Sequence, residues 1–291
     1  MVNGLLILGS RGQLGTELTA LSRATGWATT AVDIDECDIT DPGAVDHWLA
    51  LSRAEAVINC AAWTRVDAAE TDSEAAYRAN ATGPRVLAAR CEAAGALLTH
   101  VSTDFVFDGT ATAPIDEGAS PHPLSVYGAS KLAGEEEVRH GCRRHQVVRT
   151  AWLYGQHGPN FVLTVLRLAG ERDRLRVVAD QHGTPTWTGH LAPAILRLAE
   201  LGTPGTYHLT NSGSTTWHGF AEAVLAEAGV RRPVDGLTTD EYPTPAHRPA
   251  YSVLDNRAWR LLGEPPLPPW QDGLRAYIAE LSATGRLSVR H

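Results

Sequence analysis

A tyrosine and the only lysine of this 291-residue chain stand four residues apart, as Tyr127 and Lys131 in Y-G-A-S-K. The sequence predicts a helix over about 125–138, which places both side chains on one face, one turn apart. A free tyrosine has a pKa near ~10, and a cation within about 4–6 Å lowers it. Such a tyrosine can protonate a carbonyl oxygen while hydride reaches the carbon. The alternative to this catalytic role is that Tyr127 and Lys131 are only a solvated pair on the protein surface.

The single lysine is a compositional exception, because the chain has 25 Lys and Arg residues in total. Codon bias in a high-GC genome explains why arginine replaces lysine at almost every position that needs a positive charge. It does not explain why Lys131 is retained. A compact ammonium that must also reach ribose hydroxyls is not equally replaced by a planar guanidinium.

A second candidate site is the glycine loop at Gly9, Gly12 and Gly15, which lies between a predicted strand over 4–9 and a predicted helix over 13–24. Its spacing G-x-x-G-x-x-G differs by one residue from the dinucleotide-binding G-x-G-x-x-G. Glycines permit close backbone approach, and the helix N-terminus offers N–H groups and a positive dipole end to a pyrophosphate. A structural turn is the alternative, but the flanking strand and helix favour a cofactor site.

The identity of the nicotinamide cofactor is left open by two residues. Asp33 ends the second predicted strand at about the distance where an acid grips the adenosine ribose. A carboxylate there favours NADH, since it bonds a free 2′-hydroxyl and repels a 2′-phosphate. Arg11 could instead pair with that phosphate and favour NADPH, so the cofactor is predicted as NADPH or NADH.

The fourth predicted strand, over 97–102, closes with Ser102, and Thr103 and Asp104 follow directly. In a parallel sheet, ligands bind at the carboxyl ends of strands. A hydroxyl there could hold a substrate carbonyl against Tyr127. A strand-end turn, in which Asp104 bonds nearby backbone N–H groups, is the alternative.

The elements that must position these residues alternate along the first half of the chain. Asp41 and Pro42 mark a helix start by N-cap and first-turn proline. Alternating strands and helices predict a Rossmann-type, doubly wound parallel sheet. We expect a dinucleotide-binding domain over 1–155 and a smaller, mainly substrate-binding domain over 156–291, whose late segments could return to the first. The expected strands cover 4–9, 28–33, 54–60, 97–102, 146–150, 174–178 and 205–209; the expected helices cover 13–24, 42–51, 73–94, 125–138, 160–170, 190–201, 216–228 and 270–283.

Composition excludes several other classes. The net charge of −8 argues against a general nucleic-acid binder or a polybasic membrane-surface protein. Four dispersed cysteines form no metal-ligand pattern, so we expect a reduced, cytoplasmic protein with no bound metal. The N-terminal apolar run over 5–8 is too short for a signal peptide or membrane span.

Several motifs together resemble one family. The chain is similar to extended short-chain dehydrogenases/reductases and, among them, to the dTDP-4-dehydrorhamnose reductases. The resemblance covers nearly the whole length, in the family's order: GSRGQLG at 9–15, DITDP at 38–42, VINCAAWTRVDAAE at 57–70, NATGP at 80–84, VSTDFVFDG at 101–109, VYGASKLAGE at 126–135, RTAWLYG at 149–155, DQHGTPTWTGHLA at 180–192 and RPAYSVLD at 248–255.

The resemblance implies NAD(P)H-dependent reduction of the 4-keto group of dTDP-4-dehydro-L-rhamnose to dTDP-L-rhamnose, by a monomer or homodimer. It makes Tyr127 the proton donor, Lys131 its partner and Thr103 the third catalytic residue. Substrate contacts would come from Thr103, Asp104 and Trp152. Apart from the resemblance, Arg248 is a candidate cation for the substrate diphosphate, with a role in backbone packing as the alternative. The implied cofactor residues are Gly9, Arg11, Gly12, Gln13, Leu14, Gly15, Asp33, Asp38, Ile39, Ala61, Ala62, Trp63, Thr64, Tyr127 and Lys131.

Two departures from the family pattern bear on the substrate. Phe105 stands where the family usually has tyrosine, and Trp63 where it usually has tyrosine or histidine. A reductase of another dTDP-4-keto-deoxysugar from an antibiotic pathway therefore stays open. A 4,6-dehydratase is disfavoured, because such enzymes carry glutamate at the position of Phe105. A non-catalytic NADP-binding regulatory subunit is the alternative from another class.

Overall fold

The computed structural model describes residues 4–287, and a parallel sheet of six strands forms its centre. The strands lie in the order β10-β5-β4-β3-β1-β2, so the order reverses beside β1. The predicted doubly wound α/β fold is confirmed. The strands are β1 (Gly4–Leu8), β2 (Ala28–Val32), β3 (Ala56–Asn59), β4 (Leu97–Thr103), β5 (His145–Thr150) and β10 (Gly205–His208).

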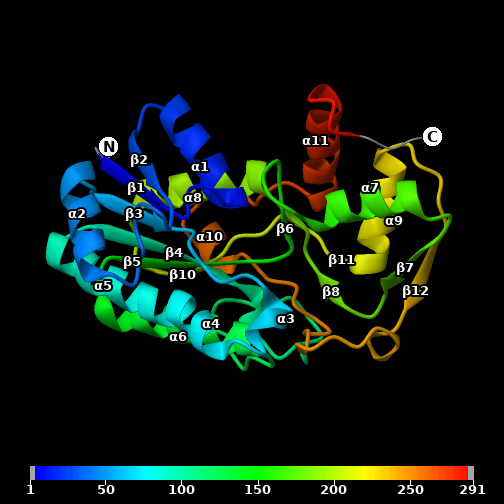
Figure 1. The fold of residues 1–291 in the computed structure, drawn as a ribbon, viewed down its shortest axis with the longest axis horizontal. Coiled ribbons are helices and arrows are strands. Elements are labelled where there is room, and N and C mark those ends of the chain that lie inside the picture. Colours follow the sequence, from blue (N-terminus) through cyan, green and yellow to red (C-terminus); the bar gives the residue numbers. More distant parts are fainter. Residues whose placement is uncertain (1–3, 288–291) are drawn as a thin grey trace.

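Helices cover both faces of this sheet (Figure 1). Alternate residues of β1 face opposite sides, so Leu5 and Ile7 join one core while Leu6 and Leu8 join the other. The first face is covered by α1 (Gln13–Ala24), α8 (Thr188–Leu201) and α10 (Arg257–Leu261); the second is covered by α2 (Pro42–Ser52), α5 (Gly83–Ala94) and α6 (Val126–Gly141).

The predicted N-cap of α2 is confirmed, since the Asp41 carboxylate accepts from the Gly43 amide at 2.8 Å with Pro42 in the first turn. The continuous helix predicted over 73–94 is wrong in its middle. The chain forms α4 (Ser73–Tyr77), a π-helical segment (Arg78–Thr82) and then α5. The buried Asn80 side chain bonds the Trp63 backbone nitrogen at 2.8 Å, so this wider turn faces the loop that follows β3.

A smaller group of elements packs beside the sheet around its own apolar core, which includes Val162, Leu166, Phe220, Val224 and Trp270. Its helices begin and end close to the predicted positions. It contains β6 (Leu153–Tyr154), β7 (Leu175–Val178), β8 (His182–Gly183), β9 (Thr186–Trp187), β11 (Thr215–Thr216), β12 (Val234–Leu237), α7 (Phe161–Glu171), α9 (Trp217–Glu227) and α11 (Trp270–Ala283).

One late segment belongs to the large sheet. Strand β10 pairs with β5, and α8 packs against α1, so residues 188–208 extend the first unit even though they follow residue 155. A return of late segments to the first domain is among the expectations from the sequence, and the division between residues 155 and 156 stays a prediction.

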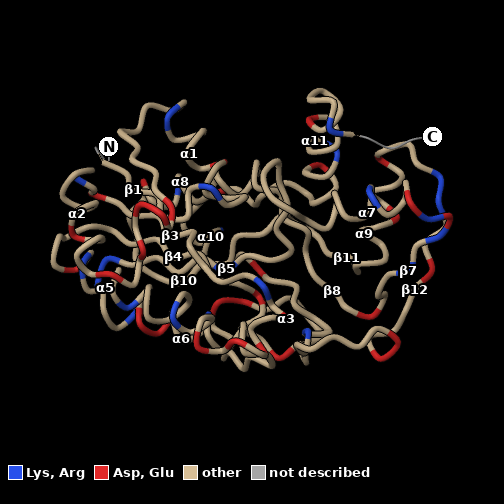
Figure 2. Tube along the Cα trace, viewed as in Figure 1, with Lys and Arg blue, Asp and Glu red and all other residues tan. Residues whose placement is uncertain are grey.

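Charged residues lie mainly on the outer helices and loops, and the central strands are largely uncharged (Figure 2). Within residues 4–287, no helix combines the length and apolar character needed to cross a bilayer. The remaining short elements are α3 (Val66–Ala69) and the 3₁₀ turns Asp104–Val106 and Thr239–Glu241.

Candidate active site

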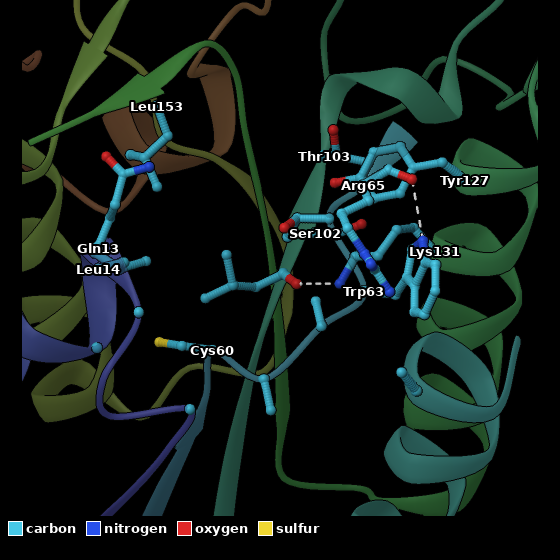
Figure 3. A pocket seen from close by; sticks show the side chains of 18 of the residues that line it. Gln13, Leu14, Cys60, Trp63, Arg65, Ser102, Thr103, Tyr127, Lys131 and Leu153 are labelled. Atoms are coloured by element: carbon cyan, nitrogen blue, oxygen red, sulfur yellow. Dashed lines mark hydrogen bonds between the residues drawn. The ribbon is translucent and has the colours of Figure 1, made fainter. Parts of the chain in front are cut away.

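A cavity of about 1260 Å³ opens at the carboxyl ends of β1, β3, β4 and β5. It is lined by every residue predicted from the sequence as a cofactor, catalytic or substrate residue. Figure 3 shows two groups of side chains across this space, with Gln13, Leu14 and Leu153 on one side and Trp63, Arg65, Thr103, Tyr127 and Lys131 on the other. The fold therefore joins segments that are far apart in the sequence.

The glycine loop forms a cradle that side chains would fill. Gly9 has a φ of +73°, and a Cβ there would lie 2.6 Å from the Ala61 nitrogen. A Cβ on Gly15 would lie 2.1 Å from the Gly9 carbonyl oxygen. Helix α1 begins after Gly12 with no side-chain cap, so its N-terminus is available to an anion. This geometry fits a dinucleotide pyrophosphate.

Arg11 and Asp33 meet at the adenosine end of this cradle. The Asp33 carboxylate accepts from the Arg11 amide at 2.8 Å and from the Ile34 amide at 2.9 Å, which ties the loop to the end of β2. The Arg11 guanidinium turns to Asp35 at 2.8 Å and to Glu36 at 3.3 Å. Sequence reasoning missed these two acidic partners, whose closeness to Arg11 depends on the loop's path.

Tyr127 is buried at the other end of the cavity. The Phe105 ring packs edge-on against it, with ring centroids 5.6 Å apart. Burial raises the pKa of Tyr127 to about 12, although a hydrogen bond with Thr103 acts in the opposite direction. The expected lowering of this pKa by Lys131 is therefore wrong, because loss of water dominates. The phenol keeps its proton at neutral pH, which is the form a proton donor requires.

Lys131 is 2% exposed, and its ammonium donates to the Val101 carbonyl oxygen at 2.7 Å. Burial lowers its pKa to about 8, and the charge of Glu135, one turn further along α6, partly offsets that effect. The Val101 carbonyl and the burial of the side chain explain why this position has the compact ammonium group of a lysine and not the larger guanidinium of an arginine.

Glu135 belongs to a buried polar network that the sequence reasoning did not single out. Its carboxylate accepts from the Ser102 hydroxyl at 2.6 Å and from the Arg149 guanidinium at 2.7 Å. The network joins α6 to β4 and β5, and its β4 member, Ser102, directly precedes Thr103 in the chain. The i+4 spacing from Lys131 to Glu135 was the available signal, but Arg149 becomes adjacent only when β5 pairs with β4.

Asp104 is also buried beside Tyr127, and its carboxylate accepts from the Thr103 hydroxyl at 3.1 Å. Burial raises the pKa of Asp104 to about 6, while hydrogen bonds with Ser252 and Thr103 act to lower it. The predicted strand-end position thus places both Thr103 and Asp104 on the cavity wall.

Trp152 lines the cavity together with Trp217, on the side of the smaller unit. Its backbone has a φ of +47°, a left-handed conformation that is strained for a bulky residue. The indole stacks on Trp217 with centroids 3.5 Å apart and planes 7° apart. A Cβ on Gly183 would lie 2.3 Å from Trp152, so the glycine makes room for the ring. Sequence reasoning missed Trp217 and Gly183.

Arg248 lines the cavity but is engaged by an acidic residue. Its guanidinium contacts the Asp67 carboxylate at 2.9 Å and the Ala246 carbonyl at 3.1 Å. Its role toward a substrate diphosphate stays a prediction. Among residues 4–287, no three His, Cys, Asp or Glu side chains are grouped so that they could hold a metal ion.

The glycine cradle at the reversal of strand order and the buried Tyr127–Lys131 pair in the same cavity define a Rossmann-type protein of the short-chain dehydrogenase/reductase class. The family model described as "RmlD substrate binding domain" matches residues 3–283. The chain therefore belongs to the dTDP-4-dehydrorhamnose reductase family, and the resemblance drawn from the motifs is confirmed.

Individual relatives are similar over most of their length. The dTDP-4-dehydrorhamnose reductase of Streptomyces griseus is 43% identical over 279 residues, covering 92% of this chain and 91% of the relative. The solved structure of dTDP-4-dehydrorhamnose reductase from Bacillus anthracis in complex with NADP has a TM-score of 0.94 at 38% identity, covering 96% and 100% of the two chains. The ortholog from Clostridium acetobutylicum has a TM-score of 0.93 at 40% identity, covering 96% and 99%.

Proposed function

We propose that this protein reduces the C4 ketone of dTDP-4-dehydro-L-rhamnose to the hydroxyl of dTDP-L-rhamnose, with NADPH or NADH as electron donor. The observation that supports it best is the single cavity that joins the glycine cradle to Thr103, Tyr127 and Lys131. Relatives named dTDP-4-dehydrorhamnose reductase, at 43% and 42% identity, support the substrate.

The reduction needs a hydride at C4 and a proton at its oxygen. The reduced nicotinamide supplies the hydride when it is bound. Tyr127 donates the proton to the developing alkoxide, and Thr103 holds the carbonyl oxygen against the phenol. Lys131 orients the cofactor ribose and its positive charge stabilises the phenolate that Tyr127 leaves behind.

The cofactor phosphates would lie on the backbone of Gly12, Gln13 and Leu14, where α1 begins. Asp33, Asp38 and Ile39 would surround the adenosine, and Ala61, Ala62, Trp63 and Thr64 would follow the cofactor toward the nicotinamide. The complex of the Bacillus anthracis relative with NADP supports NADPH as an electron donor.

A second candidate is reduction of another dTDP-4-keto-deoxysugar. A Streptomyces niveus relative, 39% identical over 288 residues, is named dTDP-4-keto-6-deoxy-D-glucose reductase. Where the family usually has tyrosine, Phe105 lacks the hydroxyl group beside Asp104. Where the family usually has tyrosine or histidine, Trp63 places an indole near the expected cofactor path. Both changes alter the polar contacts that a keto sugar meets.

Product analysis separates these candidates. The purified protein is incubated with NADPH and either dTDP-4-dehydro-L-rhamnose or dTDP-4-keto-6-deoxy-D-glucose, and NADPH oxidation and product NMR are recorded. Turnover of the first substrate to dTDP-L-rhamnose is expected. Preferential turnover of the second would favour the alternative, while absence of turnover of either by folded, NADPH-bound protein would contradict the reductase and favour a regulatory subunit.

A further inference from the structure

One cationic side chain on the cavity wall, that of Arg65, forms no ion pair within residues 4–287. Arg65 follows β3 by a short loop, and its guanidinium carbon lies 4.1 Å from the centroid of the Trp63 ring. The Trp63 indole nitrogen donates back to the Arg65 carbonyl oxygen at 3.0 Å. The indole therefore fixes both the backbone and the charged group of Arg65 by a hydrogen bond and a cation–π contact.

The other cations that line the cavity are already engaged. Arg11 pairs with Asp35, Arg78 with Asp38 at 2.9 Å, and Arg248 with Asp67. Lys131 is buried and donates to a carbonyl oxygen. In the part of the chain that the structure describes, Arg65 makes no ion pair with a carboxylate, so its charge is available to a ligand.

The position of Arg65 is at the reacting end of the cavity. Trp63 and Val66, on either side of it in the chain, pack against the buried cluster that contains Tyr127. Figure 3 shows the Arg65 side chain on the same wall as Thr103 and Tyr127, across from Gln13 and Leu14 of the glycine loop. This placement separates Arg65 from the expected cofactor pyrophosphate.

A nucleotide-linked keto sugar carries its diphosphate on C1, across the pyranose ring from C4. When C4 lies at Tyr127, the diphosphate must lie about one sugar ring away and needs a cation there. Guanidinium groups match phosphate oxygens with paired donors and are readily held on aromatic faces. We infer that Arg65, oriented by Trp63, binds the diphosphate of the nucleotide-sugar substrate, an inference that rests on the proposed function.

Binding of dTDP tests this inference without turnover. Calorimetric titrations use the full chain saturated with NADPH, with dTDP as the diphosphate probe and thymidine as the probe without phosphates. Arg65→Gln should weaken dTDP binding roughly 10–100-fold, because charge-assisted hydrogen bonds are lost. Arg65→Lys should weaken it less, and both variants should keep wild-type affinity for thymidine and NADPH.

An arginine outside the cavity provides the control. Arg23→Gln, in the last turn of α1, removes one charge elsewhere and should leave dTDP affinity unchanged. Steady-state kinetics of Arg65→Gln should show a raised KM for the nucleotide sugar with kcat within roughly three-fold, the pattern of lost ground-state binding. Circular dichroism confirms that each variant is folded.

The outcomes separate the inference from the proposed function. Wild-type affinity of Arg65→Gln for dTDP would overturn the inference, as would a loss confined to Arg248→Gln or a loss of NADPH affinity in Arg65→Gln. A wild-type protein that neither binds dTDP nor reduces a dTDP-4-keto sugar would contradict the proposed function itself.

Discussion

Tyr127 shows how one residue's environment decides its chemistry. Its phenol is buried and its pKa is raised to about 12, so the proton is present across the physiological range. A donor in the direction of ketone reduction needs this protonated form before the reaction. The phenolate of Tyr127 forms only as the proton is transferred, and the positive charge of Lys131 stabilises it at that stage.

Tyr127→Phe should reduce kcat roughly 10²–10⁴-fold, the usual contribution of a positioned acid. NADPH affinity should stay near the wild-type value, since the ring and its contact with Phe105 are retained. Stopped-flow reduction kinetics and fluorescence titration with NADPH measure the two quantities. Turnover close to the wild-type rate would remove Tyr127 from the proposed acid role.

Lys131→Arg keeps the positive charge but enlarges a side chain that is 2% exposed. The guanidinium cannot occupy the same enclosed space beside the Val101 carbonyl without displacing neighbours, so we expect kcat/KM to fall by roughly 100-fold or more. Arg90→Lys, a partly exposed change on α5, is the matched control and should have no effect. Retained activity in Lys131→Arg would show that charge alone suffices.

Asp104 gives a prediction about pH and stability. Its pKa of about 6 in the folded protein exceeds the ~3.9 of an unfolded chain, so folding disfavours the charged form. The penalty is absent below about pH 4, grows between pH 4 and 6 and is complete above that, where it reaches about 3 kcal/mol.

Asp104→Asn removes this penalty. Relative to the wild type, the variant's free energy of unfolding should therefore rise between pH 4 and pH 8 by up to about 3 kcal/mol. Urea unfolding at the two pH values measures the difference. If the free energies of unfolding of the wild type and the variant change by the same amount between the two pH values, the raised pKa of Asp104 is contradicted.

At the scale of elements, the loop after β5 and the start of α9 form one aromatic wall. Trp152 keeps a strained backbone because Trp217 stacks on its ring and Gly183 leaves room for it. Strand β8, which contains Gly183, pairs with β11, and β11 leads directly into Trp217 at the start of α9, so the pairing brings Gly183 close to the stacked rings. Such over-determined strain is typical of ligand sites.

Gly183→Ala and Trp217→Leu should each raise the KM for the nucleotide sugar roughly 2–10-fold, because the stacked wall loses its orientation. NADPH affinity should not change, since neither Gly183 nor Trp217 belongs to the glycine cradle. Gly170→Ala on α7 is the matched control, because a Cβ there has no neighbour within 4 Å. An unchanged KM in both variants would contradict a role for the wall.

The helices and strands that were predicted correctly are those with local sequence signals. The apolar run of β1, the glycine loop and the Asp41–Pro42 start of α2 are local signals, and each produced the predicted element. The helix over 73–94 could not be read fully, because its π-helical segment is stabilised by Asn80 contacts with Trp63 and Ser130. Those partners are distant in sequence.

At the scale of the whole molecule, the cavity wall is made from both packed units. Gln13 of α1 donates to the Pro159 carbonyl at 3.0 Å, so the loop before α7 closes against the glycine loop. A cofactor bound in the glycine cradle would lie beside this loop, because Gly158 and Pro159 line the same cavity. Ligand binding should therefore stabilise the two units together.

NADPH at about 100 times its Kd should stabilise the folded protein by about 2.7 kcal/mol. For a chain of this size, the expected rise in Tm is a few degrees, and the melting curve should keep one transition. Differential scanning calorimetry measures both. Gly15→Ala should lose the shift, because its Cβ would lie 2.1 Å from the Gly9 carbonyl; an NADPH-independent Tm in the wild type would contradict cofactor binding at this cradle.

The sequence by itself determined the fold class, the glycine cradle and the Tyr127–Lys131 pair, because strand and helix periodicity, turn glycines and i,i+4 spacing are local properties. All residues predicted for the site line one cavity. Tertiary structure alone decided that burial raises the Tyr127 pKa, that acidic neighbours engage Arg11 and Arg248, and that Arg65 stays available. These outcomes depend on which distant segments exclude water or supply a charge, and chain folding brings those segments together through contacts that no local pattern specifies.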